Sequence, residues 1–217
     1  MSGPVEIMGV VAFPNENGKR DCRFIDSDYN TLFTVPDGGN IIVTDMDGRE
    51  SVLECRYIDD THVAVGGTTA YHICQFAEIQ EQNARVYRPE QPKEGDCCNT
   101  YTIYQLKDTR ETSYGYMPFE AAKDKLHPSH YRKAYQGMLA PSVTLESLFR
   151  KHNMDGRPFG QRMRSMSMSD VVVVKRNGEE KAYYVDRHGF AEMNRFLHPP
   201  QRQARQQRPK KKSRPER

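Results

Sequence analysis

The segment DVVVVKRNGEEKAYYVD, residues 170–186, constrains the fold more than any other part of the chain. Asn177 and Gly178 separate two runs of strand-forming residues, and both residue types tolerate the positive φ angles of a type I′ turn. A two-residue turn fixes the register of the hairpin that it closes. The expected cross-strand pairs are Arg176–Glu179, Lys175–Glu180, Val174–Lys181, Val173–Ala182 and Val172–Tyr183.

Four consecutive valines, Val171–Val174, form the first strand of this hairpin. Side chains alternate between the two faces of a strand, so a strand with one face in water alternates apolar and polar residues. The valines break that alternation and place apolar side chains on both faces. We therefore expect both faces to be covered, one by a helix and the other by more of the chain or by a partner.

The residues before the hairpin have the patterns of short strands and helices. Residues 100–106 (TYTIYQL) alternate polar and apolar residues, which is typical of a strand. Residues 119–126 have apolar residues at helical spacing, and this helix should end before Pro128. Thr144 is a suitable N-cap for a second helix, which Asn153 can close.

Strands and turns are also the main expectation for the first segment of the chain. Asp47-Gly48 separates two of these strands and is a strong hairpin signal. A two-residue loop would place Asp45 directly opposite Glu50, so either the loop is longer or both side chains point into water. Residues 73–80 have helical spacing and predict a short helix. The expected strands are residues 5–13, 40–46, 50–57 and 61–65.

A polar segment with two prolines, RPEQPKEGDCCN, separates the two patterned parts. Pro89 and Pro92 disfavour a helix around them. The fold class that follows is α+β, with two small mixed modules that contain antiparallel sheets and a disordered basic C-terminal tail. The expected boundaries are 1–88 for a strand-rich α+β module, 89–99 for a linker, 100–197 for a second α+β module and 198–217 for the tail.

The tail has a strong positive charge. From Arg202 to Arg217 there are eight basic residues and one acidic residue, a charge of +7, although the whole chain has only +3. The tail has no apolar residue larger than Ala204, so it cannot bury enough surface to offset its chain entropy. Nucleic acid, ribonucleoprotein or an acidic protein face could attract it. The residues predicted to contact phosphate are Arg202, Arg205, Arg208, Lys210, Lys211, Lys212 and Arg214.

Composition excludes several other classes of protein. No apolar run approaches the roughly 18 residues that a membrane span requires. The start of the sequence, MSGPVEIMGVVAF, has neither a cationic stretch nor a signal-peptide cleavage pattern. The five cysteines are scattered, whereas a secreted disulfide scaffold has denser and more regular spacing. We therefore expect a cytoplasmic protein with no membrane partner.

No pattern of residues predicts catalysis or metal binding. His72 and Cys74 are one residue apart, but a structural zinc site usually has paired ligands two to four residues apart. Cys22, Cys55 and Cys74 are more simply explained as small core residues. The sequence has no nucleophile elbow, zinc-protease motif, phosphate-binding glycine loop or kinase motif set. We therefore predict a protein without catalytic residues, metal or cofactor.

Aromatic residues gather in the second segment beside Arg132 and Lys133, and they allow two interpretations. They could stack on bases, as in proteins that bind single strands. The favoured interpretation is ordinary packing at strands and helix edges. The cluster consists of Tyr101, Tyr104, Tyr114, Tyr116, Phe119, Tyr131 and Tyr135.

Ordered motifs in the second segment carry a family resemblance. They are Thr102–Lys107, Thr144–Phe149, Arg164–Val174, Asn177-Gly178, Ala182–Asp186 and Gly189-Phe190. Together, over about residues 100–195, they resemble the YodL-like domain. The first segment, with Arg23–Asp26 and Thr34–Gly38, looks more loosely like a large polyvalent protein-associated domain of mobile elements.

The resemblance implies a cytoplasmic accessory protein of a mobile genetic element in gut bacteria. Such proteins are thought to act by binding, in interference with host cell-shape machinery or in counter-defence during DNA transfer. No catalytic constellation comes with the resemblance. We therefore expect a non-enzymatic protein that binds and modulates or inhibits a host macromolecule, a bacterial protein of defence or cell shape, and the alternative is nucleic-acid binding through the tail in element transfer or regulation. The residues predicted to contact a protein partner are Arg162, Arg164, Tyr184 and Arg187.

Overall fold

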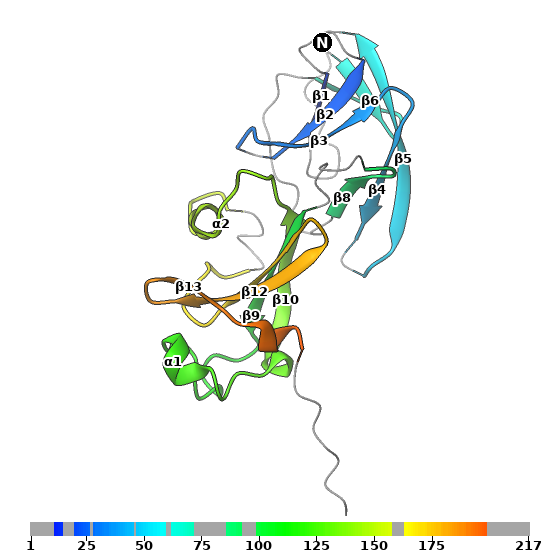
Figure 1. Cartoon of the computed structure of the whole chain (residues 1–217). Helices are drawn as coiled ribbons and strands as arrows, with labels where there is room; N and C mark the ends of the chain where they lie inside the picture. Colours follow the sequence, from blue (N-terminus) through cyan, green and yellow to red (C-terminus); the bar gives the residue numbers. More distant parts are fainter. Residues whose placement is uncertain are drawn as a thin grey trace, which may run out of the picture.

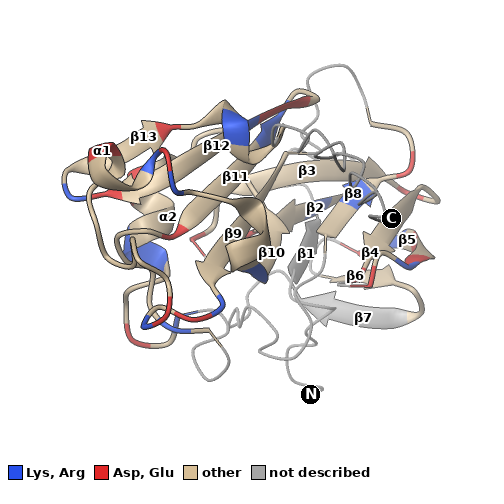
Figure 2. Ribbon diagram, turned by 90° about the horizontal axis from the view of Figure 1, so that it is seen from below, with Lys and Arg blue, Asp and Glu red and all other residues tan. Residues whose placement is uncertain are grey.

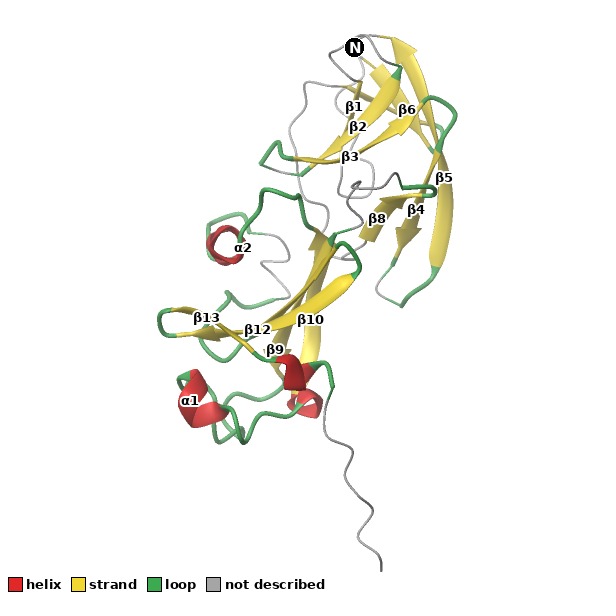
Figure 3. Ribbon diagram, in the orientation of Figure 1, coloured by secondary structure: helices red, strands yellow, loops and turns green. Residues whose placement is uncertain are grey.

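The computed structural model describes residues 11–14, 20–26, 28–45, 47–59, 62–71, 86–92, 99–157 and 163–198 (Figure 1). Over these residues the chain forms three antiparallel sheets, with few and short helices (Figure 3). The predicted antiparallel sheets are confirmed, but the fold is richer in strands than the predicted α+β class. The predicted helix at 73–80 and the predicted disordered tail lie outside the described residues.

The second module is built on a sheet with the strand order β10-β9-β11-β12-β13. The strands in chain order are β9 (Thr100–Leu106), β10 (Tyr131–Met138), β11 (Val171–Arg176), β12 (Glu179–Asp186) and β13 (Gly189–Glu192). The module also contains the helices α1 (Phe119–Ala122) and α2 (Leu145–Lys151) and the 3-10 turns η1 (Pro128–His130) and η2 (Asn194–Phe196). The valine strand, β11, is therefore the central strand of the sheet.

The hairpin of β11 and β12 has the predicted register at every pair, from Arg176 opposite Glu179 to Val172 opposite Tyr183. Asn177 and Gly178 have φ angles of 50° and 84° and form the turn. The Arg176 side chain donates to the carbonyl oxygens of Pro141 and Val143. Because the Arg176 guanidinium binds these carbonyl oxygens, we attribute the register to the turn and the apolar pattern and not to an ion pair between Arg176 and Glu179.

Both faces of the valine strand are covered, as predicted. On one face Val172 and Val174 pack in a core with Leu148 of α2. On the other face Val171 and Val173 pack in a second core with residues of α1 and η2. Figure 3 shows α2 on one side of the sheet and α1 with η2 on the other. The second cover is therefore more of the same chain.

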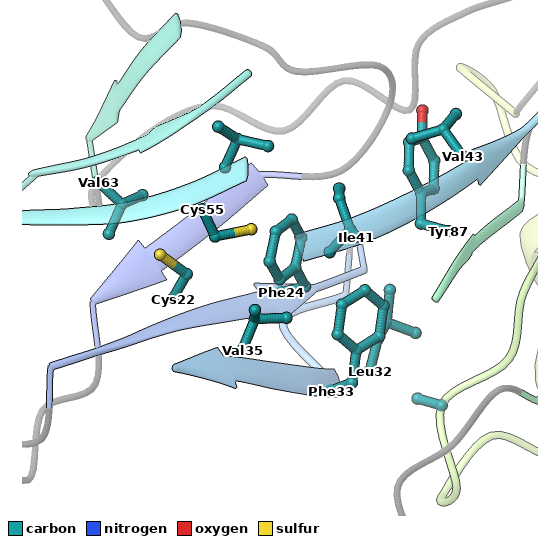
Figure 4. Close-up of a cluster of buried hydrophobic side chains, with 12 residues drawn as sticks. Cys22, Phe24, Leu32, Phe33, Val35, Ile41, Val43, Cys55, Val63 and Tyr87 are labelled. Carbon is teal, nitrogen blue, oxygen red and sulfur yellow. The ribbon is translucent and has the colours of Figure 1, made fainter. Parts of the chain in front are cut away.

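The first module contains the other two sheets, with the orders β1-β2-β3 and β7-β6-β5-β4-β8. Phe24 stacks on Phe33 with ring centroids 4.8 Å apart, and both belong to one buried cluster with Ile41 and Cys55 (Figure 4). Cys22 and Cys55 are fully buried there, as predicted for core residues. The strands are β1 (Val11–Pro14), β2 (Asp21–Ile25), β3 (Thr31–Pro36), β4 (Asn40–Thr44), β5 (Glu50–Asp59), β6 (His62–Val65), β7 (Thr68–Tyr71) and β8 (Val86–Pro89).

The loop at Asp47-Gly48 is longer than two residues, which resolves the predicted conflict of charges. Thr44, not Asp45, lies opposite Glu50. The Asp45 Oδ1 atom accepts hydrogen bonds from the backbone N–H groups of Asp47 and Arg49, both at 2.9 Å. Asp45 therefore closes the loop from inside as an Asx turn.

The two modules pack against each other. Ala140, which follows β10, belongs to the buried cluster of the first module. Val143 packs against the cores of both modules. A contact of 3.8 Å between Lys151 Nζ and Asp28 Oδ2 also joins α2 to the first module. Residues of the second module thus pack in the core of the first. The predicted module boundaries stay a prediction.

Helix α2 begins and ends as its sequence predicts. The Thr144 side chain accepts a hydrogen bond from the Ser147 N–H group, and the Asn153 side chain donates to the Phe149 carbonyl oxygen at 2.8 Å. His152 follows the helix, is fully buried and lies 3.0 Å from the Tyr101 hydroxyl through its Nε2 atom. Burial lowers the pKa of His152 to about 3, with smaller contributions from the nearby cations.

The buried histidine predicts a pH dependence of stability. Because its folded pKa is about 3, His152 takes up a proton much more readily in the unfolded chain. Between about pH 7 and pH 5 this group should lower the free energy of unfolding by about 2 kcal/mol, from an unfolded pKa of about 6.5. Urea titration of the natural chain and a His152→Leu variant at both pH values measures the difference. Equal pH dependence in both chains would contradict the prediction.

Candidate functional site

The loop before α1 is attached to the hairpin by three hydrogen bonds from three nearby residues. Each bond joins a backbone group of the loop, or of Phe119 at the start of α1, to a side chain of β12 or of the residues just before β11. These bonds are Tyr116 N–H to Ser169 Oγ (3.2 Å), Tyr184 Oη–H to the Met117 carbonyl (2.6 Å) and Phe119 N–H to Asp186 Oδ1 (3.1 Å). The loop therefore has a fixed position on the sheet, although it forms no regular element at Tyr116 and Met117.

Two residues at this junction adopt a backbone conformation that side chains disfavour. Tyr116 has a φ angle of 59° and Ser169 one of 78°. Such conformations cost about 1–3 kcal/mol each and persist only where the surroundings fix them. Ser169 is fully buried, its N–H donates to the Val185 carbonyl, and its own carbonyl accepts from the Tyr131 hydroxyl, both at 3.0 Å. The bonds around Ser169 therefore fix the backbone that presents Tyr116.

The Tyr116 side chain is exposed and lies beside a cation. Tyr116 is 49% exposed and Met117 is 37% exposed. The guanidinium carbon of Arg164 lies 5.8 Å from the centroid of the Tyr116 ring. This arrangement is a cation–π contact at the surface, worth about 0.5–1 kcal/mol. We call the exposed side chains of Tyr116 and Met117, together with the partly exposed side chain of Arg164, the Tyr116–Arg164 surface.

Arg164 is fixed from below by Asp170. The guanidinium forms two bonds with the carboxylate, from Nη1 to Oδ2 at 2.9 Å and from Nη2 to Oδ1. The Arg164 side chain keeps 29% of its surface exposed, whereas the Asp170 side chain has none. Two-pronged Arg–carboxylate bonds fix direction as well as distance. The buried Asp170 carboxylate therefore holds the Arg164 guanidinium in a fixed position at the surface.

The Asp170 carboxylate accepts further hydrogen bonds. Asp170 Oδ2 accepts from the Ser167 N–H group at 3.0 Å and from the Gln105 side chain at 3.1 Å. Burial raises the pKa of Asp170 to about 6, and Arg164 is the main group that opposes this rise. At neutral pH the carboxylate is therefore ionised, and Arg164 supplies its counter-charge.

Chemically, this arrangement can bind but has no accessible base. Asp170 is completely covered, so its carboxylate can position Arg164 but cannot reach a substrate. Over the part of the chain that the structure describes, no group of three or more His, Cys, Asp or Glu side chains is placed to hold a metal ion. In the same residues no helix is long and apolar enough to cross a membrane.

Of the predicted partner contacts, Arg164 lies in the Tyr116–Arg164 surface and Arg187 is exposed in the turn between β12 and β13. Tyr184 is completely buried and its ring packs against Phe119, with centroids 5.5 Å apart. The prediction that Tyr184 contacts a partner directly is therefore wrong, because Tyr184 supports the loop from inside. Arg162 and the predicted phosphate contacts of the tail lie outside the described residues.

The aromatic cluster mostly consists of packing residues, as its favoured interpretation predicts. Tyr101, Tyr114, Tyr131 and Tyr135 are buried. Tyr116 is the exception, and sequence reasoning missed its role at the surface. A signal was present in the two polar motif residues Ser169-Asp170, since polar residues directly before a fully apolar strand need buried partners.

Comparison with known proteins gives a family-model match over the part of the chain that contains this site. The family model of the YodL-like domain matches residues 100–196, which include both the Tyr116–Arg164 surface and the residues beneath it. The resemblance found in the sequence is thus confirmed for the C-terminal part of the chain. No curated protein and no solved structure matches the chain. The resemblance of the first module to a large polyvalent protein-associated domain stays a prediction.

Proposed function

We propose that the YodL-like domain of this chain is a protein-docking module, and that its contact is the Tyr116–Arg164 surface. The observation that carries the proposal is the ion pair between Arg164 and the fully buried Asp170, which holds a partly exposed cation beside an exposed tyrosine. In the proposed role the chain is a non-enzymatic accessory protein of a mobile genetic element. It acts in the cytoplasm, where it binds and inhibits a host bacterial protein of defence or cell shape.

The composition of the surface favours a protein partner. Tyrosine and arginine are enriched among the residues that contribute most to protein–protein affinity, and methionine is enriched in interfaces. Association normally costs about 0.5–1.5 kcal/mol for each flexible side chain that becomes ordered. Here Asp170 has already ordered the Arg164 guanidinium, and three hydrogen bonds have ordered the loop. A partner therefore meets a surface that needs little reorganisation.

The proposal is tested by affinity capture from a lysate of host bacteria treated with nuclease. The natural chain and a Tyr29→Ala control should retain the same protein, and a Tyr116→Ala chain should lose it. Tyr29 is a matched control, because it is 69% exposed with a φ angle of 63° but lies in the first module. Identical retained proteins for all three chains would contradict docking at Tyr116.

A second candidate function, nucleic-acid binding, is favoured by the charge of +7 over residues 202–217. If most of these cations contact phosphates, the logarithm of duplex-DNA affinity should fall against the logarithm of salt concentration with a slope of about −5 to −6. Fluorescence anisotropy from about 50 to 200 mM salt measures this slope. The slope should nearly vanish in a chain without residues 201–217.

The same deletion separates the two functions. If it lowers only DNA affinity and leaves capture of the host protein intact, docking is the function and the tail assists it. Loss of capture together with the salt dependence would instead make nucleic-acid binding the better account.

A further inference from the structure

A pocket of about 680 Å³ lies on the side of the sheet opposite α2. One wall is the segment 123–128 that follows α1, and the other is the segment 192–196 at the end of β13 and in η2. Figure 1 shows α1 and η2 on this side of the sheet, close to the end of the described chain. The Tyr116–Arg164 surface contributes no residue to this pocket.

The floor of the pocket is apolar and rigid. Phe119, Leu126, Met193 and Phe196 supply apolar lining. The Phe196 ring packs edge-on against Tyr104 and Tyr131, with centroid distances of 5.2 and 5.3 Å. Because Phe196 belongs to the core beneath β11, the floor is an extension of that core. An apolar side chain of a ligand would therefore meet a preformed surface.

The charges at the rim differ in whether they are already paired. Lys123 lies 2.6 Å from Glu120, and Glu192 accepts a hydrogen bond from the Asn194 side chain at 3.2 Å. Lys125 and Arg195 are exposed on opposite walls, and the structure gives neither of them an ion pair among the residues that it describes. Two exposed cations, Lys125 and Arg195, thus line the apolar floor, one from each wall. Figure 2 colours the Lys and Arg positions of the ribbon blue.

We propose that this pocket binds an acidic peptide segment, with one apolar side chain on the floor and carboxylates at Lys125 and Arg195. The charge of +7 over residues 202–217 of the sequence also favours an acidic partner. Asp124 and Glu192 also line the pocket and repel phosphates and carboxylates alike, so the apolar floor is what favours a peptide over a nucleic acid. This site is a second surface and stands independently of docking at Tyr116.

The test uses the full-length protein and a short fluorescein-labelled peptide with a Leu-Phe pair followed by a run of glutamates. Replacing the Leu-Phe pair by Ser-Ser should weaken binding about tenfold, because the apolar contact is lost. Lys125→Glu and Arg195→Glu should each weaken binding of the first peptide by about tenfold. The matched control is Lys175→Glu, an exposed charge reversal on the β11–β12 hairpin outside the pocket, which should change binding less than about twofold.

Three results would overturn the proposal. One is equal binding of the two peptides, and another is an equal loss for Lys175→Glu and Arg195→Glu, which would reduce the effect to long-range charge. The third is tighter binding of single-stranded oligothymidine than of the peptide, if that binding also requires Arg195. Thermal unfolding of each variant shows whether it is folded, and the Ser-Ser peptide tests the floor without any change to the protein.

Discussion

An Arg164→Ala chain should have a free energy of unfolding at pH 7 about 3 kcal/mol below that of the natural chain. The loss is large because the substitution leaves the Asp170 carboxylate completely buried without a counter-charge. The remaining bonds from Ser167 and Gln105 are hydrogen bonds of neutral donors and cannot replace the guanidinium. Urea titration followed by circular dichroism measures the difference. Arg187→Ala is the matched control, because Arg187 is exposed and its loss should cost less than about 0.5 kcal/mol.

The pH dependence of this loss identifies its cause. The pKa of Asp170 is already raised to about 6 in the folded chain, above its unfolded value of about 3.9. The folded chain therefore binds this proton more readily, and the group makes the free energy of unfolding fall as the pH rises between these two values. Without Arg164 the folded pKa should rise further. The difference between Arg164→Ala and the natural chain should then shrink by about half or more from pH 7 to pH 5. A difference that is constant with pH would contradict an effect of the buried charge.

A Tyr116→Ala chain should bind the captured host protein about 30-fold more weakly, a loss of about 2 kcal/mol in binding free energy. The substitution removes an aromatic ring that is 49% exposed and ends its contact with Arg164, but it leaves the backbone bond of residue 116 to Ser169 in place. Stability should fall by no more than about 1 kcal/mol, the size of the lost cation–π contact, because no core contact is lost and alanine meets the same positive φ. Titration calorimetry for affinity and urea titration for stability separate the two effects.

The hairpin could be predicted from the sequence because its information is local. The turn residues Asn177 and Gly178 and the apolar pattern of Val171–Val174 fix the register and the burial of both faces within a short segment. The helix after Thr144 could be predicted for the same reason. Its N-cap, its apolar residues and its terminating residue all lie within one short segment of the sequence. The predicted fold class was less accurate. Short helical patterns in the sequence suggested a larger share of helix than the structure has, since most of its elements are strands.

Arg164 was among the predicted partner contacts, but the position of Tyr116 beside it could not be predicted from local patterns. Tyr116 is positioned through residues that are 53 and 67 positions away in the sequence, and no periodic pattern signals such bonds. The error at Tyr184 has a related cause. Strand β12 lies beside β11 inside the sheet, so both of its faces are also expected to be covered. A buried Tyr184 follows from this once the order of the strands is known.

We propose that the exposed Tyr116 beside the anchored Arg164 forms the contact surface of the YodL-like domain. The most direct test is the dissociation constant of the captured host protein for three folded chains: natural, Tyr116→Ala and Tyr29→Ala. We expect about 30-fold weaker binding for Tyr116→Ala and no more than about a twofold change for Tyr29→Ala. Equal dissociation constants for all three chains, each with native stability, would contradict it.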